Sequence, residues 1–167
     1  VWIAKGNGIN QDLKHPQENV STHAISASLV HKNTGVEAID QGIEQLEQTG
    51  YMHNHMRMYV AAIACNIGQN HWSMPAKWMY YHLLDGDWAC NALSWQWVAG
   101  SNVNKKYVAN QENINNYAHS RQRKTFLDVP YEDFEDLPIP KALQETRKLV
   151  LETKLPEKVA VKINPES

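Results

Sequence analysis

The sequence predicts an all-α fold. Apolar residues recur at helical spacing in successive segments between residues 34 and 100, and glycines at positions 50, 68 and 100 follow these segments as helix stops. No segment shows the alternation of apolar and polar residues that is typical of a half-buried strand. The 167 residues, 43% apolar and 20% charged, are enough for one domain with a sizeable core. No apolar run approaches the roughly 18 residues of a membrane-spanning helix.

The first helix is expected within residues 34–50. Thr34 and Glu37 have the spacing of a capping box, and Gly50 follows as the C-terminal stop. One face of this segment carries Val36, Ile39, Ile43 and Leu46. The helix is therefore amphipathic, and we expect that face to pack against the core.

The second helix is expected from Met52 to Ile67, with Gly68 as its end. Its second half is apolar nearly all round, so we expect it in the middle of a helical bundle. Its first half contains two histidines, an asparagine and an arginine within residues 53–57, and such groups are costly to bury without partners.

Two further helices are expected before Gly100. Ser73 followed by Pro75 is typical of a helix start, so a third helix is predicted through residue 84. The fourth is predicted over residues 87–99.

The flanking segments are less regular. Residues 1–33 are polar with several helix breakers, and residues 101–124 are rich in asparagine, which predicts a loop. Residues 128–140 are acidic and contain proline. A last helix is expected over residues 142–154, followed by a tail.

Polar side chains gather on chosen faces of two of these helices. One face of the second helix carries Asn54, Arg57 and Met58, and a stripe of the fourth carries Asp87, Asn91 and Trp95, with Trp97 turned away. A buried arginine needs a carboxylate, so Asp85 or Asp87 is the expected partner of Arg57.

Two other interpretations of these side chains stay open. An arginine–aspartate pair of this kind can simply pin two helices together. A metal site would use His53, His55 and the Asp85–Gly86–Asp87 turn, but two histidines two residues apart on a helix point in different directions. We therefore predict no metal ion.

The cysteines indicate a cellular compartment, and the net charge limits the classes of partner. Cys65 and Cys90 make no disulfide framework and are expected to be buried thiols in a reducing cytoplasm. The net charge of −2 argues against general affinity for nucleic acid, although residues 101–124 carry a local excess of basic side chains.

Two long segments carry a recognisable pattern of residues. They read TGVEAIDQGIEQLEQTGYMHNHMRM at residues 34–58 and HWSMPAKWMYYHLLDGDWACNALSWQW at residues 71–97. With these segments the chain resembles the FAD-binding helical domain of the DNA photolyase/cryptochrome family, in particular the C-terminal half of that helical bundle. The resemblance is strong over residues 33–100 and weakens through residue 137. We therefore expect a partial FAD-binding domain over residues 1–137 and a C-terminal helix and tail over residues 138–167.

The resemblance implies a set of binding residues. For the FAD cofactor these are Asn54, Arg57, Asp85, Asp87 and Asn91. Arg57 would pair with Asp85 near the flavin ring, and Asn91 would face N5 of the ring. Asn54, Met58 and Trp97 would line the cavity that receives a flipped pyrimidine dimer of DNA, with Trp97 stacking on it.

The resemblance also implies a path for electrons. Trp95 would be the first electron donor to the flavin, Trp72 would be the second, and Asn91 would tune the reduced cofactor, so these three are the candidate catalytic residues. The family's third tryptophan is expected between residues 6 and 29, where this chain has none. Trp2, Trp78 and Trp88 stay open as substitutes.

The implied parent activity is light-driven repair of cyclobutane pyrimidine dimers in DNA by electron transfer from reduced FAD. The family's antenna domain and the first half of its flavin domain are missing from this sequence, which also lacks an initiator methionine. We therefore expect either a piece of a longer protein or a chain that works with a partner, which would be the N-terminal half or another copy of itself. The alternatives are a scaffold without FAD for DNA or protein binding, and a cryptochrome-type photosensor.

Overall fold

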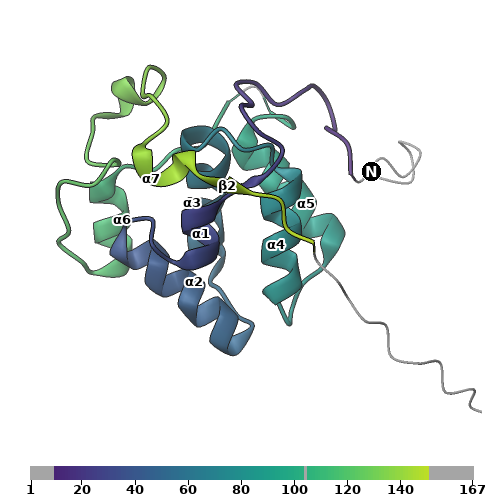
Figure 1. Ribbon diagram of the computed structural model, residues 1–167, viewed down its shortest axis with the longest axis horizontal. Coiled ribbons are helices and arrows are strands. Elements are labelled where there is room, and N and C mark those ends of the chain that lie inside the picture. The colour runs from purple at the N-terminus through teal and green to yellow at the C-terminus, as the bar shows by residue number, and fades with distance from the viewer. Residues whose placement is uncertain (1–9, 104, 151–167) are drawn as a thin grey trace, which may run out of the picture.

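The computed structural model describes residues 10–103 and 105–150 (Figure 1). Within these residues the chain forms seven α-helices, a π-helix, a short 3-10 helix and two strands of two residues each. The predicted all-α class is therefore confirmed, with a minimal sheet added to it. Among the described residues, no helix has both the length and the apolar character needed to cross a bilayer.

Helix α2 (Glu37–Thr49) is the amphipathic helix that the sequence predicts. Its buried face consists of Ala38, Ile39, Ile43 and Leu46. Gly50 ends it in the left-handed conformation, with φ +70° and its N–H donated to the carbonyl of Leu46. The predicted capping box is wrong, because the helix begins after Val36. The hydroxyl of Thr34 instead donates to Asp40, at 2.7 Å.

Helix α3 (Asn54–Ala62) continues into a π-helix, η2 (Ile63–Ile67), and together they form the predicted second helix. The ring nitrogen of His53 accepts the backbone N–H of His55, so the helix begins at Asn54 rather than at Met52. Helix α3 contacts α2, α5 and η2, and most of it after Tyr59 is buried. It therefore lies in the middle of the bundle, as expected (Figure 1).

Helices α4 (Ser73–His82) and α5 (Trp88–Ala99) pack against each other and confirm the other two central predictions. The turn between them is tied to the end of α2, because Leu84 donates its N–H to the carbonyl of Gly50, at 2.9 Å. A Cβ atom at Gly50 would lie 2.3 Å from the Leu84 side chain, so this close approach requires glycine. The contact brings the 83–87 turn to the N-terminal end of α3.

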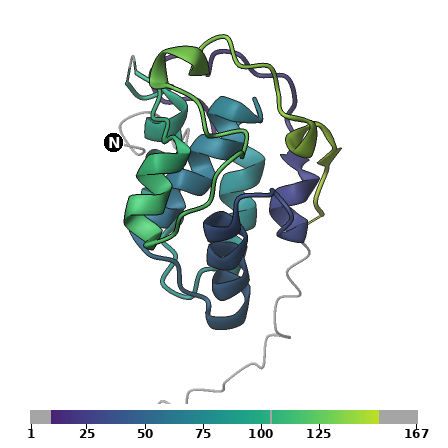
Figure 2. The same ribbon diagram turned by 90° about the vertical axis from the view of Figure 1, so that its left-hand side faces the viewer.

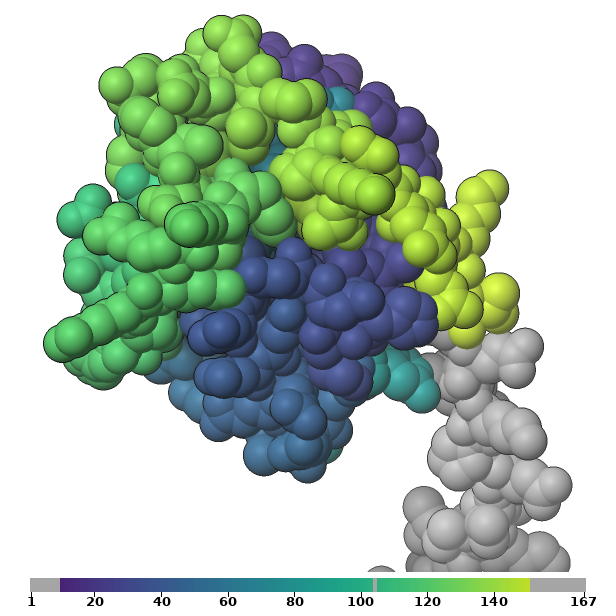
Figure 3. Space-filling model, turned by 60° about the vertical axis from the view of Figure 1, so that its left-hand side comes forward, coloured from purple at the N-terminus to yellow at the C-terminus, as the bar shows by residue number. Residues whose placement is uncertain are grey.

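The predicted loop over residues 101–124 is wrong in part, because it contains helix α6 (Gln111–Ala118). Asn110 caps this helix by accepting the N–H of Asn113, and Ile114 is fully buried. The 3-10 helix η3 (Tyr131–Phe134) follows. Figure 3 shows the segment from α6 to β2, green to yellow, over the upper part of one face, above α2 in blue.

The two ends of the described chain meet in a small sheet. Strand β1 (Ile25–Ser26) pairs antiparallel with β2 (Thr146–Arg147), beside the short helices α1 (Ala27–His31) and α7 (Lys141–Gln144) (Figure 2). The prediction of an irregular start therefore missed β1 and α1. The predicted last helix is wrong beyond Gln144, and its residues 151–154, like the tail, lie outside the described residues.

Candidate functional site

A cavity of about 290 Å³ lies between α3 and α5 and is closed at one end by the 83–87 turn. It brings together seven residues that the sequence singled out, namely Asn54, Arg57, Met58, Asp85, Asp87, Asn91 and Trp95. Pockets for small molecules in proteins usually measure roughly 300–1,000 Å³, so this one is small. Whether these residues bind a cofactor stays a prediction.

Arg57 and Asp85 form the expected pair at the mouth of this cavity. Nη2 of Arg57 donates to both carboxylate oxygens of Asp85, each at 2.9 Å, and Nε donates to the carbonyl of Met52 at 2.7 Å. The Arg57 side chain is 23% exposed and that of Asp85 is 54% exposed. A salt bridge with this much solvent exposure contributes little to stability by itself. Its importance here is that it fixes a positive and a negative charge in the cavity wall.

Asp87 has a structural task in addition to lining the cavity. Its side chain accepts the backbone N–H of Cys90 at 2.7 Å and so caps the N-terminus of α5. That hydrogen bond lowers the pKa of Asp87 below its ordinary value, so the group is a carboxylate at neutral pH. Asp87 in turn raises the pKa of the Cys90 thiol. Cys90 is exposed, which corrects the prediction that both cysteines are buried, whereas Cys65 is buried as expected.

Asn91 is held in one orientation. Its Nδ2 donates to the backbone carbonyl of Ala76 on α4, at 2.9 Å. No hydrogen bond of its Oδ1 occurs within residues 10–103 and 105–150, so this oxygen is left as an acceptor for a ligand. Trp95, only 2% exposed, supplies a flat apolar wall of the same cavity.

A second cavity, of about 710 Å³, adjoins the first and shares four lining residues with it, namely Asn54, Met58, Ser94 and Val98. Trp97, 42% exposed, lines this second cavity. The three residues predicted for substrate therefore all line this second cavity, and two of them, Asn54 and Met58, line the first cavity as well.

Trp72 stands apart from both cavities. It is fully buried, lines neither of them, and lies beside Trp88 with ring centroids 6.5 Å apart and an interplanar angle of 27°. Of the proposed substitutes for a third tryptophan, Trp88 is thus next to Trp72, and Trp2 lies outside the described residues.

The metal interpretation gains no support. His53 lies on Tyr117, with the tyrosine hydroxyl 2.8 Å from its Nδ1, while Asp85 is paired with Arg57. In the part of the chain that the structure describes, no three His, Cys, Asp or Glu side chains are grouped as metal ligands.

Several lining residues were not predicted. Ser94 and Val98 lie one and two turns beyond Asn91 on α5, and the stripe spacing could have found them. Leu13 and Lys14 reach the second cavity from the N-terminal segment. The sequence pattern gives no hint of this, because the segment has no regular secondary structure.

Comparisons with known proteins agree with the geometry. The family model for the FAD-binding domain of DNA photolyase matches residues 7–127. The deoxyribodipyrimidine photo-lyase of Agrobacterium fabrum is 46% identical over 68 residues, which are 41% of this chain and 14% of that protein. That of Synechococcus is 34% identical over 91 residues, 54% of this chain and 18% of that protein. Cryptochrome-2 of Arabidopsis thaliana is 37% identical over 68 residues, 41% of this chain and 11% of that protein.

The match covers only a small part of each of these relatives, because the matched part of the chain spans less than a fifth of their length. No solved structure matches the chain. The family model nevertheless covers most of the sequence, including every residue that lines the two cavities. The chain therefore belongs to the family of the FAD-binding domain of DNA photolyase.

Proposed function

We propose that this chain forms the flavin-ring side of a photolyase-type FAD site and that its parent activity is light-driven repair of cyclobutane pyrimidine dimers in DNA. One observation carries the proposal. The Arg57–Asp85 pair, Asn91 and Trp95 converge on one cavity, and this cavity adjoins a second one that presents Trp97.

The residues of the first cavity suit the isoalloxazine ring. Reduced FAD, when bound, would supply the light-excited electron that splits the dimer. Asn91, fixed through Ala76, offers Oδ1 to a protonated nitrogen at the ring edge, which favours the reduced cofactor. Arg57 places positive charge in the wall, and Trp95 offers an aromatic face for packing.

The same residues do not suit the whole dinucleotide. A diphosphate needs N–H donors or cations, but the lining has one basic side chain, Arg57, which Asp85 already binds. Asp87 adds a second carboxylate. We propose that contacts to the diphosphate and adenine come from the N-terminal half of a longer protein or from a second copy of this chain.

The second cavity would receive the DNA lesion. Trp97 presents an exposed aromatic ring on which a flipped base stacks, and Lys14 adds a positive charge at the rim for the phosphate backbone. Asn54 and Met58 line both cavities, so they would lie between flavin and dimer. The free thiols of Cys65 and Cys90 accord with the cytoplasmic location that we propose.

Equilibrium binding of flavins to the purified chain tests the proposal. Because the cavity fits only the ring, riboflavin and FAD should bind with dissociation constants within about threefold of each other, a difference of roughly 0.6 kcal/mol. Binding is followed by the quenching of flavin fluorescence, which Trp95 in the cavity wall should cause.

A blocking variant and a matched control make this test specific. Ser94→Trp fills the space shared by both cavities and should weaken flavin binding at least about tenfold. Asn116→Trp introduces the same side chain at an exposed position of α6 and should bind like the unchanged protein. A folded chain that quenches neither flavin would contradict the proposal and favour the scaffold without FAD.

The photosensor is the second candidate, because a cryptochrome is among the relatives. The two share the flavin cavity and differ in the reaction. Blue-light repair of an oligonucleotide containing one cyclobutane dimer, measured once flavin binding is established, separates them.

A further inference from the structure

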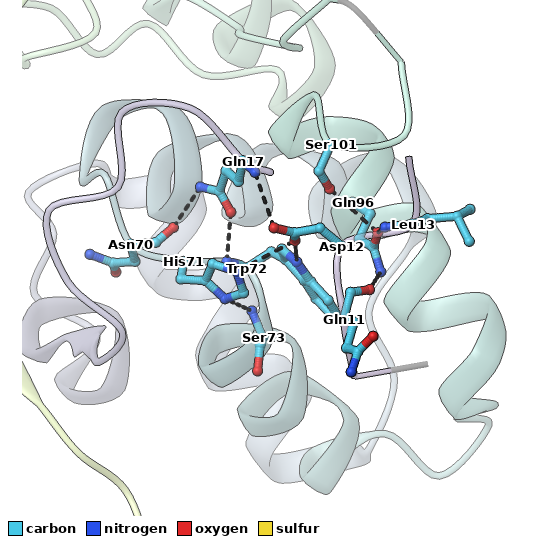
Figure 4. Close-up of polar contacts among 10 residues, drawn as sticks. All are labelled: Gln11, Asp12, Leu13, Gln17, Asn70, His71, Trp72, Ser73, Gln96 and Ser101. Atoms are coloured by element: carbon cyan, nitrogen blue, oxygen red, sulfur yellow. Dashed lines mark hydrogen bonds and ion pairs between the residues drawn. The ribbon is translucent and has the colours of Figure 1, made fainter. Parts of the chain in front are cut away.

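A hydrogen-bond network ties the N-terminal segment to Trp72 (Figure 4). Oδ1 of Asp12 accepts the indole N–H of Trp72 at 2.6 Å, and Oδ2 accepts the backbone N–H of Gln17 at 3.2 Å. Gln17 in turn accepts the backbone N–H of Trp72 through Oε1, at 2.9 Å. The segment therefore forms hydrogen bonds with both the side chain and the backbone of Trp72.

His71 completes the arrangement and fixes the direction of its proton. Its Nδ1 accepts the backbone N–H of Ser73, so in the neutral ring the proton is on Nε2, which lies 3.4 Å from Oδ1 of Asp12. Burial, opposed by Asp12, lowers the pKa of His71 below its ordinary value, so the ring is neutral at pH 7. In this state Nε2 carries a proton and faces Asp12, so His71 does not compete for the proton of Trp72.

A carboxylate on a buried indole N–H has a chemical consequence. In its ground state the indole holds its proton firmly, and the contact is simply a short hydrogen bond. An indole that has lost one electron is a far stronger acid at the same nitrogen, so a carboxylate can accept its proton. Asp12 is already in contact with that proton and its side chain is 21% exposed, so the proton has an acceptor that also reaches solvent.

We propose that Asp12 accepts the indole proton of Trp72 when Trp72 is oxidised by one electron. On the proposed function, a photoexcited oxidised flavin would take the electron. As Trp72 loses the electron, its N–H bond breaks and an O–H bond forms on Asp12. The pair changes from indole and carboxylate to a neutral indole radical and a carboxylic acid, a loss of one electron in total. The identity of the oxidant rests on the proposed function, whereas the proton transfer rests on the contact with Asp12.

The proposal accounts for the absence of a third tryptophan between residues 6 and 29. Back transfer of the electron to a cation radical needs no proton transfer, but back transfer to the neutral radical requires the proton to return as well. A proton acceptor in this same stretch of the chain would therefore slow charge recombination while the radical stays on Trp72. No third tryptophan would then be needed to carry the radical to the surface.

The test uses the whole chain without flavin, so it stands whether or not the flavin proposal holds. Cys90 is exposed and Cys65 is buried, so a thiol-reactive ruthenium tris-bipyridyl complex can be attached at Cys90, beside the cavity that Trp95 lines. A flash with a sacrificial electron acceptor converts the complex to a one-electron oxidant. Transient absorption distinguishes the cation and neutral tryptophan radicals, and subtraction of the Trp72→Phe signal isolates the part that depends on Trp72.

The neutral radical is expected in the unchanged chain, and its formation should be slower in deuterium oxide. Asp12→Asn keeps an oxygen acceptor for the indole but removes its basicity, so a cation radical is expected, with a lifetime at least about tenfold shorter. Asp136→Asn, at an exposed carboxylate, should change nothing. Asp12→Glu should restore the neutral radical in part.

Three results would overturn the proposal. They are a cation radical in the unchanged chain, a neutral radical that forms as readily in Asp12→Asn, and a radical that resides on Trp88 with no Trp72-dependent signal. The first and third of these results need no change at Asp12, so they can overturn the proposal even if Asp12→Asn fails to fold.

Discussion

The side chains of the first cavity, between α3 and α5, are held by the protein itself before any ligand arrives. Arg57 is fixed by Asp85 and the Met52 carbonyl, and Asn91 is fixed by the Ala76 carbonyl. Asp87 is fixed by the N-terminus of α5. Each of these residues therefore has a structural role beside its proposed functional one, which is why spacing alone could not separate the two roles.

The carboxylate of Asp87 makes a prediction about pH. Its hydrogen bond from Cys90 lowers its pKa below the ordinary value of 3.8, so the ionised group stabilises the folded chain at neutral pH. This stabilisation should be lost as the pH falls through the lowered pKa. Asp87→Asn keeps the cap without the charge, so its melting temperature should lie below that of the unchanged chain at pH 7, and the gap should close in acid.

Thermal unfolding by circular dichroism across this pH range measures the gap. Asp136→Asn, in which the exposed carboxylate has no hydrogen bond or ion pair among the described residues, is the control and should show no such trend. A gap that stays constant or widens in acid would show that the charge of Asp87 does not stabilise α5.

At the scale of elements, the cap of α6 explains a helix that the sequence analysis missed. Residues 110–116 contain four asparagines, which usually indicate a loop, but Asn110 caps the helix and Ile114 is buried. Asn110→Ala should lower the free energy of unfolding by about 1 kcal/mol, since the N–H of Asn113 loses its acceptor. Asn116→Ala on the same helix should be neutral or slightly stabilising. Urea unfolding measures the stability of both variants. Equal stabilities of the two would show that the Asn110 cap does not stabilise α6.

The four central helices could be predicted because each carries its own period and three of them end at a glycine. Gly50 and Gly100 both end their helices in the left-handed conformation, as their positions in the sequence indicated. The prediction of the final helix failed because the contacts of this segment are distant in the sequence. The carbonyl of Leu143 accepts from the hydroxyl of Ser26, and Thr146 pairs with Ser26 in the sheet. Local propensity carries no information about a contact across more than 100 residues.

The gathering of the candidate residues around the cavities could be anticipated in part from the sequence, whereas their binding role stays a prediction. The stripes on α3 and α5 follow from helix geometry, and the Arg57–Asp85 pair follows from the need to compensate charge. The contact of Asp12 with Trp72 could not be predicted, because it depends on how an irregular segment folds back over the helices. Contacts of this kind require the structure.

At the scale of the molecule, exposed apolar side chains gather beside the open cavity. Leu84 is 87% exposed, and Tyr51 and Tyr81 are each 52% exposed. The backbone N–H of Leu84 donates to the carbonyl of Gly50, so Leu84 lies next to Tyr51, and the adjoining turn residues line the first cavity. A partner that covers this surface would therefore stand at the cavity mouth, where we propose that the rest of FAD is held.

We expect the isolated chain to associate with itself through this surface, because water-exposed apolar groups of this size favour burial. Sedimentation velocity should show a sedimentation coefficient that rises with concentration. Leu84→Asp should abolish the rise, since a carboxylate buried in the contact would be left unpaired. Val150→Asp introduces the same carboxylate at another apolar side chain, one that is 81% exposed and distant from Leu84 in the sequence, and should leave the rise intact. A monomer at every concentration would contradict self-association and leave the N-terminal half of a longer protein as the proposed partner of this surface.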